Sequence, residues 1–161
     1  KDTHYHYLLH ICNNYGGWGA GFVLALSKKW KAPENHYKKH CAKQFLGDYS
    51  IVPVTPKLAV VNIIAQDGYI GPNKHRAVSY GALAYALVNL RQELTCIGDY
   101  DGSPLPALHM PRIGAGLGGG DWTIIEELIN FLLADHFEVY VYDLKPIANT
   151  TYANTGDSDG R

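Results

Sequence analysis

The chain has 161 residues, of which 47% are hydrophobic and 18% charged, and its formal net charge is -1. A chain of this length and composition is expected to form one globular domain with a sizeable core. The near-neutral charge excludes a strongly basic nucleic-acid binder and an acidic solvating tail. The apolar runs are far shorter than the ~20 residues of a membrane-spanning helix, and the first residues lack the pattern of a signal peptide.

The cysteines and histidines give no sign of a disulfide framework or a metal site. Three cysteines at wide spacing are an odd number, which predicts a reducing, intracellular compartment such as the cytoplasm. Of the eight histidines, three alternate along residues 4–10, but no spacing typical of zinc ligands occurs. We therefore expect surface and core histidines, with neither metal nor cofactor.

Strands and helices are predicted to alternate along the chain. The expected elements are a strand at 5–13, a helix at 21–30, a short helix at 33–45, strands at 49–54 and 58–66, a helix at 79–94, a short strand within 106–114, a helix at 122–136 and a strand at 138–144. Phe22, Leu26 and Trp30, spaced four apart, share one helix face. The nearly continuous apolar run "AVVNII" is typical of a strand covered on both faces. This order predicts an α/β domain with a largely parallel sheet.

Two further segments are predicted to lie outside the regular elements. The Gly-, Pro- and Asp-rich stretch "CIGDYDGSPLPAL" at 96–108 has the composition of a surface loop. The polar residues 145–161 have, on composition alone, the character of a disordered end.

Two glycine-rich stretches, "HICNNYGGWGAGF" and "GAGLGGGDW", each follow a predicted strand and precede a predicted helix. Glycine lets backbone N–H groups approach a ligand closely, and the helix N-terminus behind each loop favours an anion. Two such loops facing each other would suit a diphosphate, although each may also be read simply as a tight turn. Neither stretch has the Gly-Lys-Ser/Thr ending of a P-loop or fits the dinucleotide-binding fingerprint. The residues alone predict a binder of a phosphorylated ligand that is not an NTPase.

The same stretches resemble the motifs of a known family. "HICNNYGGWGAGFVLALS" resembles the first ligand loop of macrodomains that bind ADP-ribose, "HMPRIGAGLGGGDW" their second loop and "VYVYDL" their closing strand. The similarity spans roughly residues 4–144 and is strongest to the branch with ADP-ribose-1''-phosphate phosphatases and terminal ADP-ribose hydrolases. It implies a single macrodomain over 1–161, with a three-layer α/β/α fold and a mixed, mostly parallel central sheet flanked by helices.

The resemblance also implies a ligand site built from both loops. Asn13 would hold the distal ribose, Trp18 and Phe22 would wall it, and Tyr142 would line the adenine; a place in the core is the alternative for Phe22. Asn62 and Gln66 lie on a strand expected to end under the site. The implied ligand-binding residues are Asn13, Gly17, Trp18, Gly19, Ala20, Gly21, Phe22, Gly114, Ala115, Gly116, Leu117, Gly118, Tyr142, Leu144 and Asp157.

Asp157 enters through a departure from the family pattern. Macrodomains usually open with a strand that ends in Gly-Asp, whose Asp hydrogen-bonds the adenine amino group, and this chain begins after that point. The C-terminal stretch "TTYANTGD" at 150–157 resembles such a strand. We therefore hypothesise a circular permutation that brings Asp157 to the adenine, since permutation is tolerated where chain ends lie close together. The alternative is a chance Gly-Asp in a tail.

Two residues are candidates for chemistry. One branch of the family pairs a Lys of the first loop with an Asp of the second, but Gly118 stands at the position of that Asp. Lys28 and Lys29 lie on the helix, where a solvated face is the preferred interpretation. The phosphatase-like branch implies a His just before the first loop, which makes His10 a candidate acid or base. Asp121 is the second candidate, through an oriented water.

Both candidates have a structural alternative. His10 is equally well interpreted as a buried histidine with satisfied hydrogen bonds, and Asp121 as the N-cap of the following helix.

Three functions therefore stay open. The first is a hydrolase of a phosphorylated or ester-linked ADP-ribose derivative, and the second is a module that binds ADP-ribose without turnover. The third is a different nucleotide binder of the doubly wound class. The expected partner is ADP-ribose or a derivative, free or attached to a protein or nucleic acid. We expect a monomer and no membrane partner.

Overall fold

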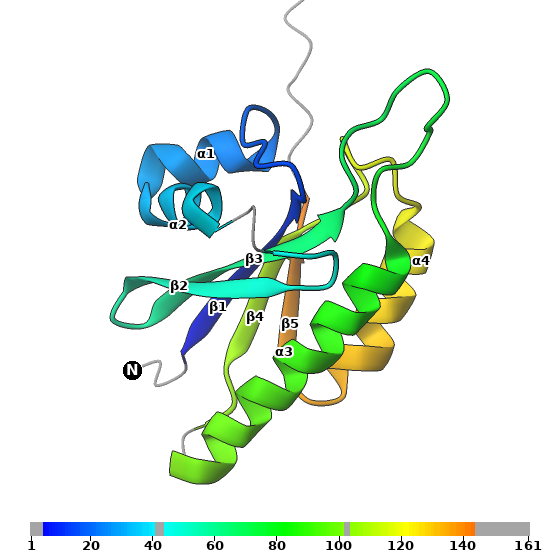
Figure 1. The fold of residues 1–161 in the computed structure, drawn as a ribbon. Coiled ribbons are helices and arrows are strands. Elements are labelled where there is room, and N and C mark those ends of the chain that lie inside the picture. The colour runs from blue at the N-terminus through cyan, green and yellow to red at the C-terminus, as the bar shows by residue number, and fades with distance from the viewer. Residues whose placement is uncertain (1–4, 41–43, 102–103, 144–161) are drawn as a thin grey trace, which may run out of the picture.

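The computed structural model describes residues 5–40, 44–101 and 104–143 (Figure 1). In chain order the elements are β1 (His6–Asn13), α1 (Phe22–Lys29), α2 (Ala32–His40), β2 (Tyr49–Thr55), β3 (Leu58–Gln66), α3 (Tyr80–Asp101), β4 (Ala107–Pro111), α4 (Trp122–Ile129), the π-helical turn η2 (Asn130–Ala134) and β5 (Glu138–Tyr142). This succession confirms the alternation predicted from the sequence.

The strands form one mixed sheet in the order β2-β3-β1-β4-β5. β2 runs antiparallel to β3, while the β3–β1, β1–β4 and β4–β5 pairs are parallel. Pro53 lies in the outermost strand β2, where a residue without an N–H is tolerated. The seven central residues of β3 are all buried, as expected for a strand covered on both faces.

Helices cover both faces of the sheet, which confirms the three-layer α/β/α arrangement. Figure 1 shows α3 and α4 on one side and α1 with α2 on the other. The larger core lies beneath α3 and α4 and includes Leu9, Val61, Met110, Leu87 and Ile125. The smaller core lies beneath α1 and α2 and consists of Cys12, Trp18, Leu26, Tyr37, Val60 and Ile64. No helix in the described ranges is long and apolar enough to cross a bilayer.

One boundary differs from the sequence prediction. The stretch expected to form a loop from Cys96 onward is helical as far as Asp101, so α3 has 22 residues. Leu90 and Leu94 of α3 are buried in the larger core. A single glycine inside a helix costs only about 1 kcal/mol, so packing of the preceding turns carries the helix through a stretch with weak helical propensity.

The parallel strands bring three connections to one edge of the sheet. β1 ends at Asn13, β3 at Gln66 and β4 at Pro111. The first glycine loop (residues 14–21), the third loop (residues 67–79) and the second glycine loop (residues 112–121) follow these ends. Ligand sites of open α/β sheets lie at this carboxyl edge, so the candidate site is expected there.

Candidate functional site

The first glycine loop is held in shape by Asn13. The Asn13 Oδ1 atom accepts hydrogen bonds from the N–H groups of Tyr15 (2.8 Å) and Gly17 (3.1 Å), and its Nδ2 donates to the Gly17 carbonyl (3.3 Å). The Asn13 side chain is buried. In the structure this amide therefore organises the loop backbone, and its contact with a ribose stays a prediction.

Tyr37 of α2 supports the same loop from below, a role that the sequence analysis missed. Its hydroxyl lies 2.6 Å from the Asn13 carbonyl and 3.0 Å from Asn13 Oδ1, and it accepts from the Gly16 N–H at 3.0 Å. The ring is fully buried. No sequence motif marks Tyr37, because its partners stand 21 and 24 residues away along the chain.

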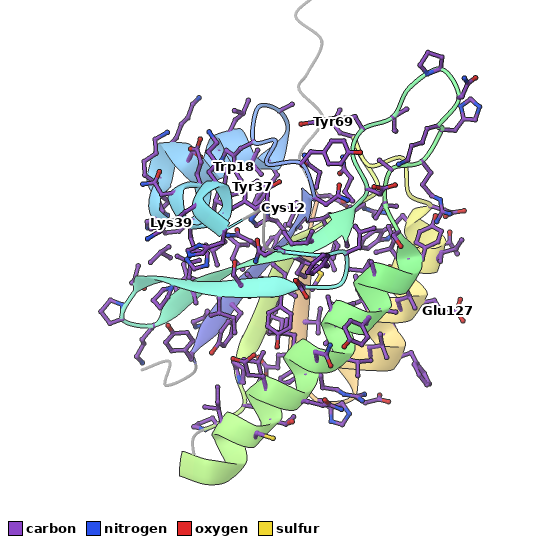
Figure 2. The ribbon with its side chains drawn as sticks, viewed as in Figure 1. Cys12, Trp18, Tyr37, Lys39, Tyr69 and Glu127 are labelled. Atoms are coloured by element: carbon purple, nitrogen blue, oxygen red, sulfur yellow. The ribbon has the colours of Figure 1, made fainter. Side chains whose placement is uncertain are left out.

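Trp18 lies in the smaller core, under α1. It is 5% exposed, and its Nε1 donates to Ser27 Oγ. Figure 2 shows Trp18, Tyr37 and Cys12 grouped between the α1–α2 layer and the sheet. The Trp18 ring is thus enclosed by protein. Phe22, by contrast, is 37% exposed, so its side chain is accessible to a ligand held at the first glycine loop.

The two glycine loops approach each other closely. Gly21 has a positive φ of 75°, and a Cβ on this residue would meet Leu117 Cδ1 at 3.3 Å. Gly114 also has a positive φ, of 74°, and its missing Cβ leaves room for Val78, Ile125 and Ile11. Glycine is favoured at both positions because a Cβ is strained in the left-handed region.

Both loops present backbone N–H groups that have no partner within the described chain. The N–H groups of Gly19, Ala20, Gly21, Gly116, Leu117 and Gly118 donate no hydrogen bond among the described residues. α1 and α4 begin directly behind these loops. The N–H groups of Gly19 to Gly21 directly precede α1, where the helix dipole adds partial positive charge that favours an anion, while those of Gly116 to Gly118 lie on the second glycine loop.

The third loop ties the two glycine loops together, and no sequence motif indicated this. Gly118 O accepts from the N–H groups of Ala77 (2.9 Å) and Val78 (3.0 Å). On the other side, Asn14 Nδ2 donates to Asp67 Oδ1 (3.1 Å) and Asn14 Oδ1 accepts from the Gly68 N–H (2.9 Å). The third loop is therefore a third side of the candidate site.

The two strand residues named beside the site differ in position. Gln66 Nε2 donates to the Gly68 carbonyl, and its Oε1 lies 3.5 Å from the place of a Cβ on Gly118, so Gln66 reaches the loops. Asn62 is fully buried beneath α2, where its Nδ2 donates to the Pro33 carbonyl at 3.1 Å.

His10 is enclosed at the centre of the molecule. It is 1% exposed, and its Nε2 lies 2.6 Å from Asn62 Oδ1. The rings of Trp18 and Phe22 lie 5.3 Å and 6.1 Å from the imidazole, between centroids. Burial lowers the pKa of His10 to about 4, so the ring is neutral near pH 7. This environment fits the alternative of a buried, satisfied histidine, and a catalytic role stays a prediction.

Asp121 is the N-cap of α4, as the sequence alternative expected. Its Oδ1 accepts from the Thr123 N–H at 2.9 Å, and its own N–H donates to the Tyr80 hydroxyl at 2.8 Å. The residue is exposed at the end of the second glycine loop. The role of Asp121 in orienting a water stays a prediction.

The remaining predicted residues lie outside the three loops. Tyr142, at the end of β5, is 54% exposed, and its hydroxyl lies 2.8 Å from His109 Nδ1. Leu144 and Asp157 lie outside the described residues. Lys28 and Lys29 are exposed in the last turn of α1, as expected of a solvated face. Across the described part of the chain, no three His, Cys, Asp or Glu side chains are grouped as metal ligands.

Comparison with known proteins agrees with this fold. A macrodomain protein from Streptomyces coelicolor is 34% identical, with a TM-score of 0.72 over 90% of this chain and 92% of that one. A Bacteroides thetaiotaomicron protein of unknown function is 38% identical, with a TM-score of 0.77 over 89% and 90%. The ADP-ribose 1''-phosphate phosphatase of Candida albicans is 28% identical over 140 residues, 83% of this chain and 86% of that protein. No family model matches.

The strand order defines a three-layer α/β domain, and the 34% identity to the Streptomyces protein identifies its family. The chain belongs to the macrodomain family.

Proposed function

We propose that the protein binds ADP-ribose or a derivative between the two glycine loops and releases phosphate from ADP-ribose-1''-phosphate. The observation that carries this proposal is the meeting of the loops at Gly21 and Leu117, with N–H groups on both sides that donate no hydrogen bond among the described residues. Three curated relatives, at 24% to 28% identity, are named ADP-ribose 1''-phosphate phosphatases, which supports the choice of substrate.

The diphosphate is the part of the ligand that this geometry explains best. Its oxygens accept hydrogen bonds from the N–H groups of Gly19 to Gly21 on one side and Gly116 to Gly118 on the other. Hydrogen bonds to a charged group contribute about 1.5–3 kcal/mol each, so a few of them suffice for specific binding. The ribose end lies toward Asn13 in this arrangement, and the adenine toward Tyr142.

His10 and Asp121 are the proposed acid–base groups for phosphate release. Asp121 Oδ1 caps α4, while no hydrogen bond to its Oδ2 is formed within the described residues, so this oxygen is available to orient a water. His10 is neutral and could accept a proton. To reach a ligand it needs the rings of Trp18 and Phe22, which pack against the imidazole, to move apart. The turnover experiment below decides between this role and a purely structural one.

Calorimetry and a phosphate assay test the proposed function. We expect ADP-ribose to bind at least about tenfold more tightly than ADP, AMP or NAD, and ADP-ribose-1''-phosphate to be hydrolysed. His10→Ala and Asp121→Ala, checked for folding by thermal unfolding, are expected to reduce the rate. ADP-ribose binding no tighter than that of ADP contradicts the binding function. Unchanged turnover in both variants contradicts the assignment of the acid–base groups.

The second candidate function is an ADP-ribose reader without turnover. The 1% exposure of His10 favours it, as does Gly118 at the position of a catalytic Asp in one branch. Tight ADP-ribose binding with no phosphate release, and no cleavage of an ADP-ribosyl ester on a protein or nucleic acid, is the result that would establish it.

We further propose that residues 150–157 complete the sheet as a permuted first strand and bring Asp157 to the adenine. Support comes from β5, the last strand in the described sheet order, whose side chains are mostly exposed. Its outer edge has no strand partner among the described residues. A strand edge of this kind is open to further pairing.

A monomeric state and a cytoplasmic location stay predictions. The free thiols of Cys12 and Cys96 support a reducing compartment. Light scattering of the purified protein checks the first prediction, and fractionation of the source cells checks the second.

A further inference from the structure

Tyr69, in the third loop, reaches over the first glycine loop. A Cβ on Gly17 would stand 1.9 Å from Tyr69 Oη and 2.6 Å from Asn13 Nδ2. Gly17 does not have a positive φ. Glycine at this position is therefore explained by the room that the Tyr69 hydroxyl occupies, rather than by backbone conformation. Figure 2 shows Tyr69 between the third loop and the first glycine loop.

The backbone that carries Tyr69 is held on both sides. The Gly68 N–H donates to Asn14 Oδ1 (2.9 Å), and the Gly68 carbonyl accepts from Gln66 Nε2 (3.1 Å). The Tyr69 ring also meets the ring of Tyr15 edge-on, with centroids 6.4 Å apart and an interplanar angle of 74°. These contacts hold the Tyr69 ring over the first glycine loop.

The position of Tyr69 is not explained by folding alone. Its side chain is 58% exposed, so it buries little apolar surface. Among the described residues its hydroxyl makes no hydrogen bond. An exposed aromatic ring beside the first glycine loop, with its hydroxyl near the Asn13 amide, is well suited to contact a polar ligand.

We propose that Tyr69 contacts the ligand at its reacting end. The hydroxyl hydrogen-bonds the terminal phosphate of ADP-ribose-1''-phosphate, and the ring covers the distal ribose from water. This inference rests on the proposed function and names a residue that makes the site prefer the phosphorylated ligand. The place of a Cβ on Gly17 is 1.9 Å from Tyr69 Oη and 2.6 Å from Asn13 Nδ2, so these two polar groups lie side by side at the first glycine loop.

Binding of two ligands to one pair of variants tests the proposal. Tyr69→Phe removes the hydroxyl and keeps the ring, so we expect about tenfold weaker binding of ADP-ribose-1''-phosphate, the loss of one hydrogen bond to a charged group. Binding of ADP-ribose, which lacks the terminal phosphate, should change less than about threefold. Tyr85→Phe is the matched control, because Tyr85 is similarly exposed on α3, outside the three loops. Calorimetry measures these affinities in an Asp121→Asn background, in which the proposed loss of phosphate release keeps the phosphorylated ligand intact.

Two results would overturn the assignment of Tyr69. One is an affinity of Tyr69→Phe equal to that of the natural protein, and the other is an equal loss for both ligands. Neither can be confused with failure of the proposed function, in which the natural protein itself does not bind ADP-ribose.

Gly17→Ala provides a second, independent measurement. The added methyl group meets the Tyr69 hydroxyl, so we expect lower stability and weaker binding of the phosphorylated ligand. In a Tyr69→Ala background the methyl group meets only Asn13 Nδ2, at 2.6 Å. Its effect on the midpoint of thermal unfolding should then become smaller without vanishing, which is the coupling expected of residues in contact. Additive effects of the two substitutions would contradict the contact on which the proposal depends.

Discussion

The chemistry of His10 is set by burial and by Asn62, a residue from another part of the chain. Its Nε2 faces Asn62 Oδ1, and the Asn62 amide is oriented by its own bond to the Pro33 carbonyl. The Asn62 oxygen can only accept, so the proton of the neutral ring lies on Nε2. Desolvation lowers the pKa of His10 to about 4, although the hydrogen bond to Asn62 acts in the opposite direction. His10 is therefore neutral in the folded protein at neutral pH.

This pKa predicts how stability depends on pH. In the unfolded chain His10 takes up a proton near pH 6.5, whereas the folded protein resists protonation down to about pH 4. The unfolded state binds more protons in this window, so the free energy of unfolding falls as the pH drops through it. The fall expected between about pH 7 and about pH 4.5 is about 2 kcal/mol, and urea unfolding at these two pH values measures it.

A pair of variants isolates the contribution of His10. His10→Gln should be less stable at neutral pH and should lose part of the pH dependence. His136→Gln, at an exposed position, should keep it. If His10→Gln retained the full pH dependence of the natural protein, the change would have to come from other groups.

At the scale of the element, α4 and the second glycine loop share Asp121. The residue ends the loop, caps the helix through Thr123 and contacts Tyr80 at the start of α3. The Asp121 backbone has extended φ and ψ of −76° and 120°, as usual for an N-cap. Asp121 thus sets both the start of α4 and one side of the candidate site.

The two roles of Asp121 can be separated by substitution. Asp121→Ala should cost about 1 kcal/mol of stability, whereas Asp121→Asn should retain the cap because Asn caps as well as Asp. If the carboxylate orients water, Asp121→Asn keeps the melting temperature but loses phosphate release. An Asn variant with undiminished turnover would show that the carboxylate acts only on the helix.

The elements also show how far local pattern predicts this fold. The strand and helix order follows from periodicity and from glycine-rich breaks, which are properties of neighbouring residues. The end of α3 does not follow from local pattern, because the buried Leu90 and Leu94 stabilise a helix that continues to Asp101. The sequence also predicted both glycine loops, while the third loop carries no motif and was missed.

For the whole molecule, the proposed role of residues 150–157 gives the most direct prediction. Asp157→Ala should weaken ADP-ribose binding about tenfold if its carboxylate holds the adenine amino group. Asp159→Ala removes the same charge two residues later and is the matched control, with affinity close to that of the natural protein. Calorimetry that finds Asp157→Ala and Asp159→Ala indistinguishable would contradict the permutation.

By itself, the sequence determined the α/β class, the alternating elements and the two glycine loops. These features depend on the spacing of nearby apolar residues and on the conformational freedom of glycine. Tertiary structure alone decided which side chains meet. Tyr69 lies over Gly17, Asn62 binds His10 and Tyr37 supports Asn13, each across more than twenty residues of chain. Such contacts depend on strand order and parallel register. Those bring distant segments to one sheet edge, and no short stretch of sequence carries that information.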